Sequence, residues 1–170
     1  MDDYVKLARE SLENYVLNNK VIEVPDWVKG ELLTKKAGVF VTLYKNKTLR
    51  GCVGTFLPTT KNLAQEIIRN AISASEDPRF WPVSKDELPL LTYEVSILSE
   101  PVLVKDKAKL DPKKYGVIVS TGNGRRGLLL PNIERVNTVG EQISIACLKA
   151  GINPNIEKIT LYCFNVEKHS

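Results

Sequence analysis

Residues 37–55 read AGVFVTLYKNKTLRGCVGT, a pattern typical of a β-hairpin. Its two halves, 37–44 and 48–55, are rich in the β-branched and aromatic residues that favour extended strands. Only the polar residues 45–47 separate the halves. A link this short joins antiparallel strands, because parallel strands need a crossover of about a dozen residues or more. We therefore predict an antiparallel hairpin here.

Helices are predicted on both sides of this hairpin, where apolar residues recur at helical spacing. The predicted segments are Asp2 to Asn19, a short turn of helix at 27–32, Asn62 to Ser75, and a last helix that begins at Thr138. Thr138 and Glu141 have the spacing of a capping box, and Gly151 can end the last helix.

Strands are predicted in the remaining apolar segments. They lie at 91–98, 102–104, 115–121, 128–131 and 159–166. The last of these is apolar on both faces, which is typical of a buried strand. Because hairpins are interspersed with only three long helices, the sequence predicts an α+β fold with antiparallel sheets and flanking helices. We expect a single domain over residues 1–170.

Composition limits the possible classes of protein. Of 170 residues, 43% are hydrophobic and 26% are charged, as in an ordinary globular domain. No apolar run approaches the roughly 20 residues that span a bilayer. The start, MDDY, lacks the basic and apolar pattern of a signal peptide. We therefore expect a cytoplasmic protein without a membrane-spanning segment.

Histidine and cysteine are too few for several kinds of chemistry. The single histidine, His169, excludes an HExxH site, a two-histidine ligand set and an internal base for a catalytic triad. We predict no metal site, and we expect His169 to be solvated. The cysteines, Cys52, Cys147 and Cys163, have neither the number nor the spacing of a disulfide framework. Cys147 and Cys163 are predicted to be core residues.

The charge distribution argues against nucleic-acid binding. The net charge is +4, but the basic residues are scattered among acidic ones. A nucleic-acid protein usually gathers them on one element with aromatic residues between them. We expect the aromatic residues Trp27, Phe80 and Trp81 to pack rather than to stack on a ligand.

Residues 122–127 read GNGRRG and match the dinucleotide-binding pattern G-x-G-x-x-G. That motif needs a helix after it, because the helix N-terminus holds the pyrophosphate. Here Leu128-Leu129-Leu130-Pro131 follows, so we interpret the segment as a hairpin whose tip presents Arg125 and Arg126. Paired guanidinium groups can hold a carboxylate or phosphate bidentately. The alternative is a solvated loop with positive charge.

Arg50 and Cys52 stand two positions apart in LRGCVGT, residues 49–55. In a regular strand such residues share a face, and a cation beside a thiol stabilises its thiolate form. Gly51 and Gly54 carry no side chain, so another backbone or a ligand can approach closely. Cys52 is therefore a candidate nucleophile, with Arg50 and Thr55 as candidate ligand contacts. The alternative is a small core cysteine on a glycine-rich strand.

Glu94 lies on a predicted strand, and Arg79 lies in the motif DPRF. If Glu94 shares a sheet face with Arg50 and Cys52, the three form a polar cluster. A buried carboxylate there could act as a base, with Arg50 or Arg79 adjusting its affinity for a proton. The alternative is a structural ion pair.

These motifs, in this order, resemble the AMMECR family. The matching stretches are Gly38 to Leu43, LRGCVGT, DPRF, Glu94 to Ser96, GRRGLLLP and Cys147 to Gly151. They span nearly the whole chain, and LRGCVGT and GRRGLLLP are the most specific of them. The one departure is the valine in RGCVG, where isoleucine is also usual.

The resemblance implies an α+β fold of a larger and a smaller part around a cleft. The strand of Arg50 and Cys52 and the hairpin of Arg125 and Arg126 would be candidates for the walls of that cleft. Microbial members are the A component of AmmeMemoRadiSam systems, which implies partners of the Memo and radical-SAM types. The chain itself lacks the cysteine run of a radical enzyme. No particular reaction, substrate or cofactor is implied.

Two hypotheses for function remain open. The first is an enzyme, or a component of one, that binds a small anionic molecule. The second is a non-catalytic adaptor for a protein partner, because no complete catalytic constellation is visible. The candidate residues are Cys52 and Glu94 for catalysis and Arg50, Thr55, Arg79, Arg125 and Arg126 for binding.

Overall fold

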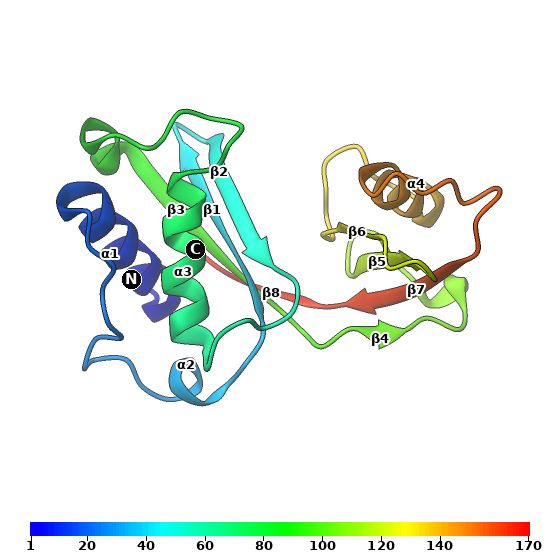
Figure 1. Cartoon of the computed structure of the whole chain (residues 1–170), viewed down its shortest axis with the longest axis horizontal. Helices are drawn as coiled ribbons and strands as arrows, with labels where there is room; N and C mark the ends of the chain where they lie inside the picture. Colours follow the sequence, from blue (N-terminus) through cyan, green and yellow to red (C-terminus); the bar gives the residue numbers. More distant parts are fainter. The chain divides into compact units, whose positions relative to one another are not determined.

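The computed structural model describes residues 1–170, which fold into two compact units (Figure 1). The first unit comprises residues 1–98 and 167–170, and the second comprises residues 99–166. Each unit contains one antiparallel sheet with helices packed on it. The predicted α+β class is therefore confirmed.

The first unit is built on a four-stranded sheet with the strand order β2-β1-β3-β8. Its strands are β1 (Gly38–Lys45), β2 (Thr48–Thr55), β3 (Leu91–Leu98) and β8 (Val166–His169). Its helices are α1 (Asp3–Asn18), α2 (Glu31–Thr34), α3 (Leu63–Ser75) and the 3-10 helix η1 (Lys85–Leu90).

Helices α1 and α3 cover one face of this sheet (Figure 1). Side chains alternate between the two faces along a strand. Val39, Val41 and Leu43 of β1 have no exposed surface and belong to the core with the helices. The side chains of Thr42 and its even-numbered neighbours on β1 therefore lie on the other face.

β1 and β2 form the predicted hairpin, but its register shifts once. Leu43 pairs with Gly51, whereas Tyr44 pairs with Leu49, so Arg50 is an extra residue in a β-bulge. The expectation of a regular strand through Arg50 is therefore wrong. A bulge changes the direction of the side chain that it carries, and this one directs Arg50 towards η1.

The second unit has the strand order β4-β7-β5-β6. Its elements are β4 (Val102–Leu103), the 3-10 helix η2 (Lys107–Lys109), β5 (Gly116–Thr121), β6 (Arg126–Leu129), α4 (Val139–Lys149) and β7 (Ile159–Phe164). Thr138 and Glu141 form the predicted capping box of α4, and Gly151 follows the helix with a φ of 66°. Neither this helix nor any other is long and apolar enough to cross a membrane.

Three predicted boundaries need correction. The short helix begins at Glu31 rather than at residue 27. Strand β6 begins at Arg126, because the hairpin turn is complete there, and it ends before Pro131. Segment 159–166 is not one strand: β7 pairs in the second sheet, whereas β8 lies beside β3 in the first.

His169 is not solvated as expected, because it lies on β8. Its side chain is only 13% exposed. The imidazole ring stacks on Tyr4 with 3.9 Å between the ring centroids, and Nδ1 lies 2.8 Å from a carboxylate oxygen of Asp2. Asp2 is also the N-cap of α1, so this contact joins the helix to the last strand.

Candidate functional site

A cavity of about 790 Å³ lies in the first unit, where the chain after α3 passes the bulge in β2. Its wall is made of Arg50 from β2, Glu87 from η1, and residues 78–82 and Ser84 from the segment between α3 and η1. It brings together two of the predicted binding residues, Arg50 and Arg79. A cavity of this size suits a small-molecule ligand.

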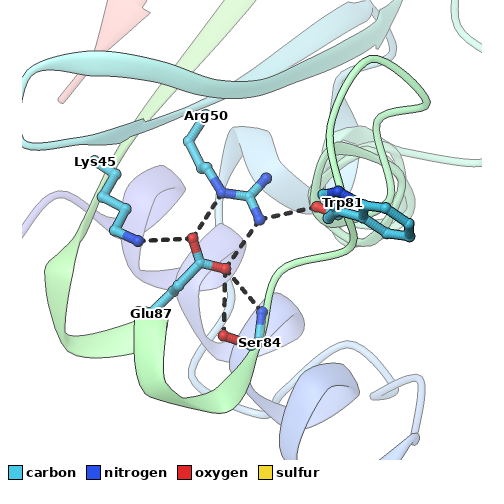
Figure 2. A network of polar contacts seen from close by, with 5 residues as sticks. All are labelled: Lys45, Arg50, Trp81, Ser84 and Glu87. Carbon is cyan, nitrogen blue, oxygen red and sulfur yellow. Dashed lines mark hydrogen bonds and ion pairs between the residues drawn. The ribbon is translucent and has the colours of Figure 1, made fainter.

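Arg50 and Glu87 form a bidentate ion pair in this wall (Figure 2). Arg50 Nε donates to Glu87 Oε1 at 2.8 Å, and Nη2 donates to Oε2 at 2.9 Å. Lys45 also donates to Oε1, and the N–H and hydroxyl of Ser84 donate to Oε2. Arg50 Nη2 further donates to the carbonyl oxygen of Trp81 at 2.9 Å. The network therefore joins β1 and β2 to η1 and fixes the segment between α3 and η1.

The two members of this pair hold each other in the charged form. Hydrogen bonds from Arg50 hold the pKa of the Glu87 carboxyl well below its usual range, although burial opposes this. In return, the hydrogen bond to Glu87 raises the pKa of Arg50. Their side chains are 13% and 15% exposed, so water and salt screen the interaction only partly.

Asp77 and Arg79 close the free edge of the sheet next to the cavity. β2 is an outer strand, so no strand is available to the N–H and C=O of Cys52 on the side away from β1. Asp77 Oδ2 accepts the N–H of Cys52 at 2.9 Å, and Arg79 Nη2 lies 3.4 Å from the Cys52 carbonyl oxygen. Arg79 Nε and Nη2 also donate to the two carboxylate oxygens of Asp77, at 3.1 and 2.7 Å. These hydrogen bonds hold the pKa of the Asp77 carboxyl well below its usual range.

The arginine groups of the cavity keep some donor capacity. Nη1 of Arg50 and Nη1 of Arg79 donate no hydrogen bond to another residue, because both carboxylates occupy the Nε–Nη2 edge. Both guanidinium groups lie near the Phe80 ring, at 5.8 and 5.6 Å from its centroid. The charged residues of the wall itself are two arginines, Arg50 and Arg79, and one carboxylate, Glu87.

Cys52 and Glu94 lie on the sheet face that points away from the helices. Thr42 of β1 pairs with both of them and separates them. The Thr42 hydroxyl donates to Cys52 Sγ at 3.3 Å, and Glu94 forms an ion pair with Lys168 of β8 at 3.2 Å. No ion pair joins Glu94 to Arg50 or Arg79, so the expected cluster of Glu94 with an arginine of the cavity does not form. Catalytic roles for Cys52 and Glu94 stay predictions.

Thr55 does not line the cavity, and it bonds to a buried carboxylate instead. Its hydroxyl donates to Glu66 Oε1 at 2.7 Å. Thr59 and Thr60 donate to the same carboxylate through their N–H and hydroxyl groups. Burial would raise the pKa of Glu66, but these hydrogen bonds lower it overall. Ligand binding by Thr55 stays a prediction.

Arg125 and Arg126 lie in the hairpin of β5 and β6, as expected. Arg125 is not free at the tip: Nη1 donates to the Gly151 carbonyl oxygen at 2.6 Å, and Nη2 is paired with Glu157. Arg126 is exposed and makes no ion pair. Both residues belong to the second unit, and their expected part in ligand binding stays a prediction.

Sequence reasoning missed the carboxylates that hold the cavity arginines. Asp77 stands within DPRF, but only the arginine of that motif was singled out. Glu87 follows Ser84 at capping-box spacing, and that signal could have marked it as an ordered carboxylate. Trp81 is also misjudged: it is 89% exposed and does not pack, whereas Trp27 packs against the core as expected.

Comparisons with known proteins identify the family of this chain. The AMMECR1 family matches residues 5–169. A Thermotoga maritima protein is 55% identical over 168 residues, which cover 98% of this chain and 96% of the relative. A Clostridium acetobutylicum protein, CA_C1420, is 52% identical over 170 residues, and these cover 99% of this chain but only 36% of that protein.

A solved structure has the same fold. The crystal structure of uncharacterized protein PH0010 from Pyrococcus horikoshii matches with a TM-score of 0.88 and 35% sequence identity. The match covers 97% of this chain and 88% of that one. The architecture is thus that of an α+β protein with two antiparallel sheets. Within this class, the chain belongs to the AMMECR1 family.

Proposed function

We propose that the chain binds a small anionic molecule at the cavity of Arg50 and Arg79 and serves as an enzyme or a component of one. The observation that carries the proposal is the state of the two guanidinium groups. A carboxylate fixes each group along one edge, while Nη1 remains without a protein partner.

This arrangement favours binding for three physical reasons. A side chain that is already ordered loses little conformational entropy when a ligand binds to it. The planar guanidinium also presents its donors in a fixed geometry that suits carboxylate and phosphate groups. The two arginines of the wall outnumber its one carboxylate, which adds an attraction for an anion and a repulsion for a cation.

A catalytic role would involve the neighbouring strand. Cys52 is linked to the cavity through its backbone, because Asp77 and Arg79 bind its N–H and C=O. A ligand held by Arg79 would therefore lie close to the strand that carries the candidate nucleophile. The family resemblance supports a shared pathway with Memo-type and radical-SAM proteins, which we include as partners in this proposal.

Calorimetric titration with inorganic phosphate and with malonate, at low salt, tests the proposal. We expect at least one of these anions to bind the native chain. Arg79→Gln should weaken that binding roughly tenfold or more, because a charge-assisted hydrogen bond is lost. Arg79→Lys keeps the charge but not the planar donor group. Its affinity for the anion should therefore lie between that of the native chain and that of Arg79→Gln.

Arg69→Gln is the matched control. It removes the same charge from an exposed position on α3 that does not line the cavity. Native affinity in Arg69→Gln, together with loss in Arg79→Gln, supports the site. If neither anion binds the native chain, or if Arg79→Gln binds as tightly as the native chain, the proposal is wrong.

A further inference from the structure

Trp81 is the most exposed large apolar side chain in the molecule, with 89% of its surface accessible. Tryptophan side chains are highly buried on average, because they carry a large apolar surface. Trp81 lies in the wall of the cavity, directly after Arg79 and Phe80. Its indole therefore contributes little to the core and is available to a ligand.

The backbone holds Trp81 in this exposed position. Its carbonyl oxygen accepts a hydrogen bond from Arg50 Nη2 at 2.9 Å, while its ring points away from the network around Glu87 (Figure 2). Pro82 follows directly, and Pro78 begins the same stretch of wall. Proline fixes the backbone angle φ, so this stretch has less freedom to fold the indole back onto the protein.

A flat apolar surface and two cationic groups thus occur in one cavity. An indole can stack on a flat ring, and such stacking does not depend on the identity of the ring. The guanidinium groups of Arg50 and Arg79 have free Nη1 donors for an anionic group. The volume of about 790 Å³ is large enough for a ligand that carries both.

We infer that the ligand is an anion that carries a flat aromatic ring, with the ring on Trp81 and the anionic group on Arg79. This inference rests on the proposed function, since it specifies the chemical class of the same ligand. A nucleoside monophosphate has both parts and serves as the probe. Ribose 5-phosphate carries the same anionic group without the ring, and adenosine carries the ring without the phosphate.

The test follows the indole N–H signals of the ¹⁵N-labelled chain during titration with adenosine 5′-monophosphate, ribose 5-phosphate and adenosine. The chain has two tryptophans. Trp27 is an internal control, because its Nε1 donates to Glu10 and its ring packs against the core. We expect adenosine 5′-monophosphate to shift the Trp81 signal alone and to bind roughly tenfold more tightly than ribose 5-phosphate. Trp81→Leu should remove that difference.

The outcomes distinguish this inference from the proposed function. If ribose 5-phosphate and adenosine 5′-monophosphate bind equally well, the ring has no site and the inference is wrong, although the anion site stands. If Trp81→Leu keeps the tighter binding of adenosine 5′-monophosphate, the ring lies elsewhere and the inference also fails. If the three compounds, inorganic phosphate and malonate all fail to bind, the proposed function is wrong as well as the inference.

Discussion

Glu87 receives hydrogen bonds from Arg50, Lys45 and Ser84, and Asp77 receives them from Arg79 and from the backbone of Cys52. Neither carboxylate could accept a substrate proton readily, because these donors hold both in the charged form. Each carboxylate instead fixes the position of one arginine: Glu87 holds Arg50, and Asp77 holds Arg79. We therefore regard Glu87 and Asp77 as positioning residues of the site.

Glu87→Gln tests the electrostatic part of this view. The pKa of Glu87 in the folded chain lies below the ordinary value of about 4.3. Below that pH the unfolded chain binds a proton that the folded chain does not, so the stability contributed by this carboxylate is lost as the pH falls. We expect the free energy of unfolding of Glu87→Gln to decline less steeply with falling pH below about 4.3, in urea unfolding at several pH values.

Asp86→Asn is the control for this measurement. Asp86 is the exposed neighbour of Glu87 and makes no ion pair. Its substitution should change the free energy of unfolding near neutral pH less than Glu87→Gln does, because no ion pair is lost. An equal effect of both substitutions would contradict a special role for Glu87.

Alkylation of the three cysteines tests the placement of the candidate nucleophile. Cys147 is 1% exposed, and burial raises the pKa of its thiol, so it should react only when the chain unfolds. Cys52 is half-buried and accepts a hydrogen bond from Thr42. We expect Cys52 to be modified in the folded chain, as detected by peptide mass spectrometry. An inert Cys52 in the folded chain would mark a packed strand residue and contradict its role as a nucleophile.

The two most specific motifs, LRGCVGT and GRRGLLLP, each place a glycine of a strand against a helix. A Cβ on Gly51 of β2 would meet the carbonyl oxygen of Ala74 in α3, and a Cβ on Gly127 of β6 would meet that of Ala146 in α4. No side chain fits between backbones that are this close. This contact explains why LRGCVGT and GRRGLLLP require glycine at these positions.

Gly51→Ala and Gly127→Ala should each destabilise the fold by about 3 kcal/mol, because the added methyl group must displace backbone rather than a flexible side chain. Gly122→Ala is the matched control, since nothing lies within 4 Å of its Cβ position. We expect the control to change the free energy of unfolding by less than about 0.5 kcal/mol. Similar values for all three substitutions in denaturant unfolding would show that the helices can move away.

The sequence predicted those elements whose signals are local. The hairpin of β1 and β2, the long helices and the capping box of α4 depend on residues close in the chain. The register of β2 could not be predicted, because the bulge at Arg50 depends on packing between distant segments. For the same reason the sequence does not reveal the pair of Arg50 and Glu87, which are 37 residues apart, and it points to Glu94 as the acidic member instead.

The chain forms two compact units and passes between them twice. Segment 159–166 has the pattern of one strand, but its residues belong to two sheets: β7 lies in the second sheet, and β8 begins at Val166 in the first. One unit by itself contains the complete cavity of Arg50 and Arg79. Binding of an anion to this cavity can therefore be tested on the full chain without reference to the second unit.

The most direct measurement is an NMR titration of the arginine Nε–H groups with inorganic phosphate. Those of Arg50 and Arg79 donate to carboxylates, which slows their exchange with water and makes them observable. We predict that phosphate shifts both signals, while the Nε–H signal of Arg9, which lies on α1 at 3.4 Å from Glu13 and does not line the cavity, does not move. If the signals of Arg50 and Arg79 stay unchanged at millimolar phosphate and at millimolar malonate, or shift no more than that of Arg9, the cavity is not an anion site.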